Sequence, residues 1–331
     1  MGSVDMPSEN ENSNGTTTDS KKVHDVIIVG AGAAGIGVAI SVAHSGVENF
    51  LIVDRKGVAS SFAAWPAETR FITPSFPSNS IGMLDLNSVA IGVSPAFNMR
   101  IEHPTGKEYA EHLQGLADFF ELPIRENTNI LRLEKTDELF HLETDEGTLF
   151  AKKVIWAAGE YQYPSQGAFL GSDLCLHTSR INSYSNLDGE DYLIIGGYES
   201  GIDAAYHLSK HGKSVRVFDQ NCPWGEESSD PSVALSTYTF ERIQSIEFET
   251  NVELFSEKSV QSITYDGSMY ELKTEDGGVF QSGNQPLLAN GFEGSHKLIS
   301  NLFEHRDDGF AELNDQDEST ITPGLFLAGP M

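Results

Sequence analysis

The sequence is poor in cysteine: only two of its 331 residues are cysteines, Cys175 and Cys222. Two cysteines this far apart do not build a disulfide framework, and such low usage is typical of the reducing cytoplasm. No C-x-x-C pair occurs, which excludes a direct match to enzymes that relay electrons through a paired dithiol. A lone cysteine is more often packed than reactive, so packing is the favoured role of both.

Basic residues and long apolar runs are also scarce. Lys and Arg total 21 against 49 Asp and Glu, a formal net charge of −28. This charge disfavours nucleic-acid partners and anionic membranes, which need basic surfaces. It fits a very soluble surface or, slightly favoured, adaptation to a high-salt cytoplasm in which salt screens carboxylate repulsion. No run of about 20 apolar residues exists, so no membrane insertion is expected, and no metal site is expected either.

Residues 1–22 are rich in Ser, Asn, Glu, Thr and Gly and contain no apolar core. A segment of this composition cannot bury enough apolar surface to fold, and it lacks the apolar stretch of a signal peptide. We therefore expect a disordered tail.

What the chain does have is one phosphate-binding pattern written twice. In the first copy an apolar run, 24–29, breaks into a glycine turn and a helix-forming stretch, and a second apolar run ends in an acid. The glycines of such a turn permit the bend, the approach of a pyrophosphate and close helix–strand packing, while the acid binds a ribose hydroxyl. The candidate residues of this copy are Gly30, Gly32, Ala33, Ala34, Gly35, Asp54 and Arg55.

The second copy follows the apolar run 191–195 and has nearly the same spacing to its acid. Its candidate residues are Gly196, Gly197, Glu199, Ser200, Gly201 and Asp219. It departs at the middle glycine, where Tyr198 stands and makes close approach of a pyrophosphate less certain. The alternative for each copy is a plain strand–helix–strand unit with a glycine turn, and this alternative is stronger for the second copy.

The segments after each motif also repeat. A helix is expected over 109–120, followed by three short strands, at 129–135, 139–144 and 148–152, and a return strand ending in Ala157-Ala158-Gly159. In the second half a helix around 233–243 precedes strands at 252–256, 259–265, 270–274 and 279–281, and 286–291, ending in Gly291, mirrors the return strand. The sequence thus predicts an α/β protein with two Rossmann-like dinucleotide-binding domains, each with a parallel sheet and a three-stranded β-meander.

Residues 56–104 form a long irregular stretch, rich in Ser, Pro, Asn and Phe. A loop of this length in a compact domain is usually functional. Its segment 70–79 is predicted to be a lid or a flavin-ring contact, with a structural wrap over the sheet as an equally weighted alternative.

Taken in order, the two glycine motifs, the return strand and the final segment 322–329 resemble the two-dinucleotide-binding-domain flavoproteins. This superfamily includes the flavin-containing monooxygenases and the pyridine-nucleotide disulfide reductases, and the resemblance covers about residues 24–331. It implies FAD in a first domain, 23–165 and 285–331, and NADH or NADPH in an inserted second domain, 166–284. It also implies that Ala158, Gly159, Gly291 and Gly329 lie beside the cofactors, with Gly329 next to the flavin's ribityl or phosphate chain.

Three departures from the family pattern stand out. The last motif usually continues Gly-Asp, but Pro330 follows Gly329, and the sequence stops at Met331 before the helix that normally faces the flavin. The resemblance then implies either a truncated chain or weaker flavin binding. The monooxygenase fingerprint is only approximated, because His177 lies two positions too far from Phe169-x-Gly171. A packed linker histidine is therefore favoured over a catalytic one.

Three functions remain open at this level. The favoured one is a monooxygenase-like oxidoreductase that passes hydride from the nicotinamide to the flavin and then to O₂ and a small-molecule substrate. The second is an NAD(P)H-dependent reductase of a low-molecular-weight disulfide or a quinone, and the third is a nucleotide-binding protein without turnover. No catalytic side chain is predicted, because the cofactors carry the chemistry. Asp219 favours NADH over NADPH, whereas Lys213 and Arg216 lie nearby and could reverse that preference. A homodimer is a possible assembly.

Overall fold

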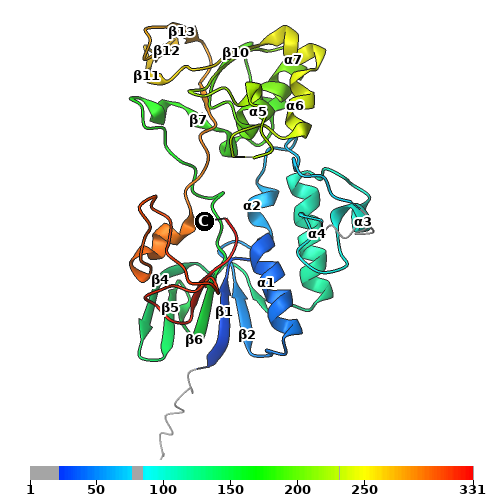
Figure 1. Cartoon of the computed structure of the whole chain (residues 1–331), viewed down its shortest axis with the longest axis vertical. Coiled ribbons are helices and arrows are strands. Elements are labelled where there is room, and N and C mark those ends of the chain that lie inside the picture. The colour runs from blue at the N-terminus through cyan, green and yellow to red at the C-terminus, as the bar shows by residue number, and fades with distance from the viewer. Residues whose placement is uncertain (1–21, 77–84, 231, 331) are drawn as a thin grey trace, which may run out of the picture.

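The structure is a computed structural model that describes residues 22–76, 85–230 and 232–330. Nearly all of the predicted tail and residues 77–79 of the predicted lid segment lie outside this range. Figure 1 shows two lobes stacked along the long axis of the molecule. Within the described residues, no helix has both the length and the apolar character needed to cross a membrane.

The lower lobe in Figure 1 is built on a seven-stranded sheet of order β3-β2-β1-β6-β5-β4, with β15 paired to β6. Its strands are β1 (Val23–Val29), β2 (Phe50–Val53), β3 (Ile124–Arg125), β4 (Ile130–Thr136), β5 (Leu139–Thr144), β6 (Gly147–Trp156) and β15 (Leu325–Leu327). The third meander strand and the return strand, predicted separately, are one strand, β6. Its first half pairs antiparallel with β5 and its second half runs parallel between β1 and β15.

Helices α1 (Ala33–His44) and α4 (Gly106–Phe119) cover one face of this sheet, together with the short α2 (Ser60–Ala63) and α3 (Pro95–Met99). Ile36 and Ile40 of α1 pack with Tyr109 and Leu113 of α4 in one buried cluster. Helix α4 begins three residues earlier than predicted because Thr105 caps it: its hydroxyl accepts from the Glu108 N–H, and the Glu108 carboxylate accepts in return from Thr105 N.

The second lobe contains a five-stranded parallel sheet, β10-β9-β8-β14-β7, and a separate three-stranded sheet. The parallel strands are β7 (Leu176–His177), β8 (Asp191–Ile195), β9 (Ser214–Phe218), β10 (Val252–Phe255) and β14 (Leu287–Leu288), and the helices are α5 (Glu199–Lys210), α6 (Thr237–Ile243) and α7 (Ile246–Asn251). The separate sheet is the predicted meander: β11 (Val260–Tyr265), β12 (Tyr270–Thr274) and β13 (Val279–Ser282).

Two details of the second lobe differ from expectation. Strand β10 was expected in the meander but pairs in parallel with β9. Strand β14 pairs with β8 and β7, although the predicted boundary at residue 285 assigns it to the first domain. Short 3-10 turns complete the chain: η1 (Ser172–Leu174), η2 (Thr178–Arg180), η3 (Tyr184–Asn186), η4 (Pro223–Gly225) and η5 (Ser295–Leu302).

Candidate cofactor sites and the cavity between the domains

The turn between β1 and α1 requires glycine for steric reasons. Gly30 has a φ of +109°, and a methyl group there would lie 2.3 Å from the carbonyl oxygen of Ala157, just beyond the end of β6. A methyl group on Gly35 would lie 1.9 Å from the carbonyl oxygen of Gly30, so only glycine lets α1 pack this close to the strand. The middle residue, Gly32, caps α1 and faces open space: apart from its two chain neighbours, no described residue has an atom within 4 Å of the position that a methyl group on it would take.

The turn between β8 and α5 repeats this geometry. Gly196 has a φ of +100°, and its missing methyl group would lie 2.3 Å from the carbonyl oxygen of Ala289. A methyl group on Gly201 would lie 1.9 Å from the carbonyl oxygen of Gly196. Ala289, after β14, therefore has the same contact with Gly196 that Ala157 has with Gly30. The predicted duplication extends to these individual contacts.

The two acids occupy the same position in the two units. Asp54 Oδ2 accepts a hydrogen bond from Ala31 N at 2.9 Å, and Asp219 Oδ2 accepts one from Gly197 N at 2.7 Å. Each second oxygen also accepts from the loop that follows, from Gly57 N at 2.8 Å and from Asn221 N at 2.7 Å. A carboxylate has about four lone-pair sites, so each acid holds its turn together and keeps acceptor capacity for a ribose.

The residues around the first turn fit FAD. A cavity at the carboxyl ends of β1 and β2 is lined by Gly30, Asp54, Arg55 and Ala158, which the sequence analysis had grouped. The guanidinium of Arg55 lies over the ring of Tyr163, 5.9 Å from its centre. Gly159, with a φ of +67°, continues the same edge. These groups surround the place where the adenosine half of a dinucleotide would lie.

The open N-terminus of α1 is the second part of this fit. Ala33, Ala34 and Gly329 line one groove along the helix, and Gly329 stands so close to Ala34 that a methyl group on Gly329 would approach its Cβ to 2.8 Å. Ala328 N donates to Trp156 O at 3.0 Å, which brings the final strand to the helix. The first N–H groups of a helix have no partner within it and attract phosphate.

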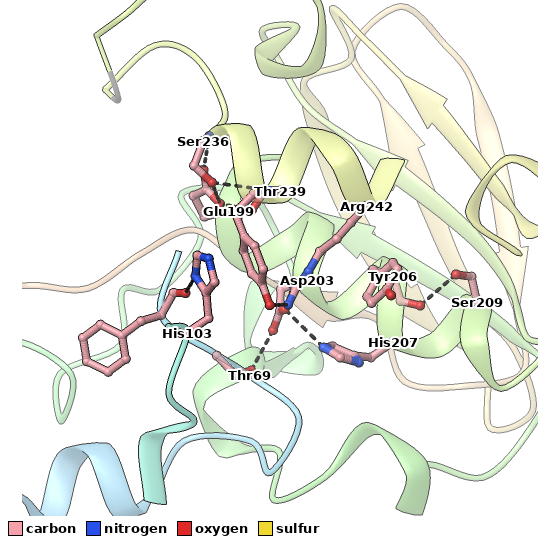
Figure 2. A network of polar contacts seen from close by, with 12 residues as sticks. Thr69, His103, Glu199, Asp203, Tyr206, His207, Ser209, Ser236, Thr239 and Arg242 are labelled. Carbon is pink, nitrogen blue, oxygen red and sulfur yellow. Dashed lines mark hydrogen bonds and ion pairs between the residues drawn. The ribbon is translucent and has the colours of Figure 1, made fainter. Parts of the chain in front are cut away.

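In the second domain the predicted residues divide into two groups. Ser200 is exposed in the first turn of α5, where it can meet a phosphate. The Glu199 carboxylate instead accepts hydrogen bonds from Ser236 N, at 2.5 Å, and from the Thr239 hydroxyl, and so ties α5 to the start of α6 (Figure 2). These contacts give Glu199 a structural role, and its role in cofactor binding stays a prediction.

His177 and Gly291 hold each other in the linker region. His177 Nε2 donates to the carbonyl oxygen of Gly291 at 3.0 Å, and Nδ1 accepts from Ser179 N at 3.2 Å. Burial lowers the pKa of the His177 imidazole, so the ring is neutral at pH 7. Both ring nitrogens are engaged, which supports the packed linker histidine and leaves Gly291 positioned by the same contact.

A cavity of about 230 Å³ lies between the two domains, and no pattern in the sequence predicts it. On one side are residues of the long irregular stretch, and on the other is the first part of α5. Its aromatic residues are Trp65, Phe71, Tyr161, Tyr184 and Phe292. Its polar residues include Thr69, Arg70, Glu199, Ser200 and Asp203. The segment predicted as a lid thus contributes Arg70, Phe71 and Ile72 to this cavity.

A buried carboxylate joins the domains at the edge of this cavity (Figure 2). Thr69, from the first domain, donates its hydroxyl to Asp203 Oδ2 at 2.7 Å, while His207 and Arg242 contact Oδ1 from the second domain. Burial alone would raise the pKa of the Asp203 carboxyl, but the His207 and Arg242 contacts outweigh it and hold the pKa below its ordinary value. His103 also stacks on Tyr238 across the domains, with ring centres 4.1 Å apart.

Both cysteines are free, and Cys175 lacks the surroundings of a reactive thiol. Burial raises the pKa of the Cys175 thiol to about 12, which keeps it protonated at neutral pH. Cys222 is half-buried in the loop after β9 and is not disulfide-bonded. Within the described ranges, no group of three or more His, Cys, Asp or Glu side chains is arranged to bind a metal ion.

Known proteins resemble this chain over most of its length. The sequence pattern of the family described as "Pyridine nucleotide-disulphide oxidoreductase" matches residues 27–329. An uncharacterized oxidoreductase, CzcO-like, from Geobacillus kaustophilus is 29% identical over 190 residues, which are 56% of this chain and 51% of that protein. The chain spans about half the length of the first curated relatives it matches.

Solved structures share the fold. The bacillithiol disulfide reductase Bdr from Staphylococcus aureus superposes with a TM-score of 0.77 at 19% identity, over 93% of this chain and 90% of that one. A flavin monooxygenase mutant from Stenotrophomonas maltophilia superposes with a TM-score of 0.70 at 15% identity, over 93% and 91%. At these identities the likeness concerns the fold.

The fold and the paired turns define a flavoprotein architecture with two dinucleotide-binding domains. The chain belongs to the pyridine nucleotide-disulphide oxidoreductase family. The superfamily, the α/β fold and the cofactor pair expected from the sequence, FAD with NADH or NADPH, are thereby confirmed.

Proposed function

We propose that this chain is an FAD-dependent NAD(P)H oxidoreductase that passes a hydride from the nicotinamide nucleotide to FAD and then to a small diffusible acceptor. The observation that carries the proposal is the duplicated turn, in which Gly30 and Gly196, with their partners Ala157 and Ala289, have the same contacts. We assign FAD to 23–165 and 285–331 and the nicotinamide nucleotide to 166–284. Strand β14 lies within 285–331 in the sequence but pairs in the sheet of the second domain.

When bound, FAD supplies a two-electron carrier between NAD(P)H and the acceptor. The part of the chain itself is to bind and orient. The N-terminus of α1 would offer N–H groups to the FAD pyrophosphate and Asp54 would accept from the ribose, while α5, Ser200 and Asp219 would do the same for the nicotinamide nucleotide. The rings of Trp65, Phe71 and Tyr161 line the cavity between the domains and would keep water from groups that react there.

The acceptor we favour is a low-molecular-weight disulfide or a quinone, reduced without a thiol of the protein. The family description and the resemblance to a bacillithiol disulfide reductase favour a disulfide. The high pKa of Cys175 and the lack of a C-x-x-C pair argue against a thiol relay.

Monooxygenation is the second candidate, because the fold also matches a flavin monooxygenase. The stretch that resembles its fingerprint has another explanation in this chain. Gly171 has a φ of +77°, and a methyl group there would lie 2.0 Å from the carbonyl oxygen of Ile263 in β11. Packing against the meander accounts for this glycine, and the linker contacts account for His177.

Anaerobic addition of NADH to the FAD-loaded protein tests the proposal. The flavin absorbance should bleach, and it should return on addition of a small disulfide or a quinone without consumption of oxygen. Return only with O₂ and an oxygenated product would establish the monooxygenase instead. A flavin that binds but bleaches with neither NADH nor NADPH would identify a nucleotide-binding protein without turnover.

A further inference from the structure

The two phosphate-binding turns differ in one side chain while their backbones agree. Gly32 and Tyr198 each cap the helix that follows, with φ and ψ of −80° and −169° for Gly32 and −80° and −165° for Tyr198. The flanking glycines agree as well, since Gly35 and Gly201 approach the first carbonyl of their turns to the same 1.9 Å. The direction of the Cα–Cβ bond is set by the backbone, so Tyr198 projects where Gly32 leaves its turn open.

That direction is the one from which a pyrophosphate approaches such a turn, because the middle glycine exists to let it come close. In the first turn, the described residues other than the two chain neighbours have no atom within 4 Å of the place where a Gly32 side chain would begin. In the second turn the phenol of Tyr198 begins there. The helix behind it is otherwise suited to phosphate, since Ser200 is exposed in its first turn.

The Tyr198 side chain is half-buried, and no hydrogen bond or ring contact joins it to another of the described residues. The rest of the turn is firmly held. The Trp224 ring lies against Gly197, 2.3 Å from where a methyl group would be, and Asp219 accepts from Gly197 N. The tyrosine is therefore a side chain without specific anchors on an anchored backbone, and it can rotate without breaking a hydrogen bond.

We propose that Tyr198 is a displaceable cover over the pyrophosphate position of the second nucleotide site. It competes with the pyrophosphate for the N-terminus of α5 and makes the site bind its nucleotide less tightly than an open turn would. The site then exchanges its nucleotide readily, which suits a hydride donor that must leave after each turnover. This inference rests on the proposed assignment of the second motif to the nicotinamide nucleotide.

Ligand-observed NMR titration of the FAD-loaded protein with ADP-ribose and with adenosine tests the proposal. ADP-ribose carries the pyrophosphate but no nicotinamide, so its dissociation constant is independent of turnover, and adenosine lacks the phosphates. Tyr198→Gly should tighten ADP-ribose binding about tenfold, because the open turn admits the pyrophosphate. It should leave adenosine binding unchanged. Glycine is accepted at a helix cap, and Tyr198→Ala offers a second variant with a small side chain.

Tyr198→Phe separates the bulk of the ring from its hydroxyl. If the ring is a steric cover, this variant binds ADP-ribose as the natural protein does. Weaker binding by Tyr198→Phe would show that the hydroxyl donates to the phosphate and would overturn the proposal. Unchanged or weaker ADP-ribose binding by Tyr198→Gly and Tyr198→Ala would overturn it too, as would an equal gain for adenosine.

The same titrations keep this inference apart from the proposed function. If adenosine and ADP-ribose bind neither the natural protein nor the variants, the assignment of the second motif falls, and the inference falls with it. If both ligands bind and only the gain in Tyr198→Gly and Tyr198→Ala is missing, the function stands and the cover alone is refuted.

Discussion

At the scale of single residues, we propose that Asp219 sets the choice between NADH and NADPH. The two basic residues that could oppose it are engaged elsewhere: Arg216 donates to Asp191 at 2.6 Å, and Lys213 donates to the carbonyl oxygens of Leu187 and Gly189 at 2.6 Å. An acid in this position accepts from the free ribose of NADH and repels the phosphate of NADPH. These contacts remove the two opposing charges from the argument, and the preference for NADH stays a prediction.

We therefore expect Asp219→Ala to weaken NADH binding by about tenfold or more and to weaken NADPH binding less, or even to improve it. The dissociation constants of both nucleotides for the FAD-loaded protein measure this. Because Asp219 also holds Gly197 N, Asp219→Asn serves as a control that keeps an acceptor in the turn. Equal losses for NADH and NADPH in both variants would rule out the ribose role.

Glu160, directly after Gly159, is a half-buried residue for which the sequence predicted no role. Burial raises the pKa of its carboxyl above the ordinary value, so the folded protein holds this proton to a higher pH than the unfolded chain does. The unfolded chain then binds fewer protons in the window above the ordinary glutamate pKa, and the stability falls as the pH rises through that window.

Glu160→Gln removes this ionisation. The variant should have a higher Tm than the natural protein at pH 7, and the difference should vanish at about pH 3, where the natural carboxyl is protonated in both states. Thermal unfolding followed by circular dichroism at the two pH values measures it. The exposed Glu143→Gln is the matched control and should change little at either pH. A lower Tm for Glu160→Gln at pH 7 would contradict the argument.

At the scale of elements, the contact between α5 and α6 depends on a buried ion pair. Arg242 and Asp203 are 9% and 10% exposed, and the Arg242 guanidinium also lies over the rings of Tyr206 and Tyr238, at 4.9 and 4.2 Å. Removing one partner of such a pair leaves the other charge buried and uncompensated. Asp203 is in addition the acceptor for Thr69, so the loss reaches the first domain.

Arg242→Ala should therefore lower the free energy of unfolding by about 3 kcal/mol. Arg132→Ala, which removes an exposed ion pair with Glu134, should lower it by less than about 1 kcal/mol. Urea unfolding of the FAD-loaded protein, followed separately by flavin absorbance and by circular dichroism, measures both. A cost for Arg242→Ala no larger than that for Arg132→Ala would mean that water reaches Asp203.

The elements themselves show what a sequence can and cannot predict. The glycine turn before helix α1 was predicted from the sequence, because Gly30 and Gly35 each answer a local steric need. The pairing of β10 with β9 and the continuity of β6 were not, since strand partners are chosen by tertiary packing and not by a local pattern. The Asp203 network was invisible for the same reason: Thr69, Asp203 and Arg242 are far apart in sequence and meet only through the domain arrangement.

At the scale of the whole molecule, the duplication supports the proposed division of the two nucleotides between the two halves. Each half has a glycine turn and an acid that accepts a hydrogen bond from the turn. The helix cap is the open Gly32 in the first half and Tyr198 in the second. The open copy suits a cofactor that stays bound, and the covered copy suits one that comes and goes. The cavity between the halves lies at the first turn of α5, where the second nucleotide would enter from its own domain.

The net charge of −28 belongs to this scale as well, because it acts on the molecule as a whole. Repulsion among so many carboxylates opposes the folded state at low salt, and salt shortens its range from about 10 Å at 0.1 M to about 3 Å at 1 M. We expect the Tm at pH 7 to rise by several degrees between these salt concentrations. Thermal unfolding in KCl measures it.

The pH dependence of the salt effect separates charge screening from a general action of salt on apolar surface. Near the isoelectric point, where most of the net charge is gone, the gain from KCl should shrink to a small fraction of its value at pH 7. Equal gains at the two pH values would assign the effect to stronger burial of apolar groups, which does not depend on protein charge. No gain at pH 7 would refute the adaptation to high salt, because a surface built for that environment must lose stability when its carboxylates are left unscreened.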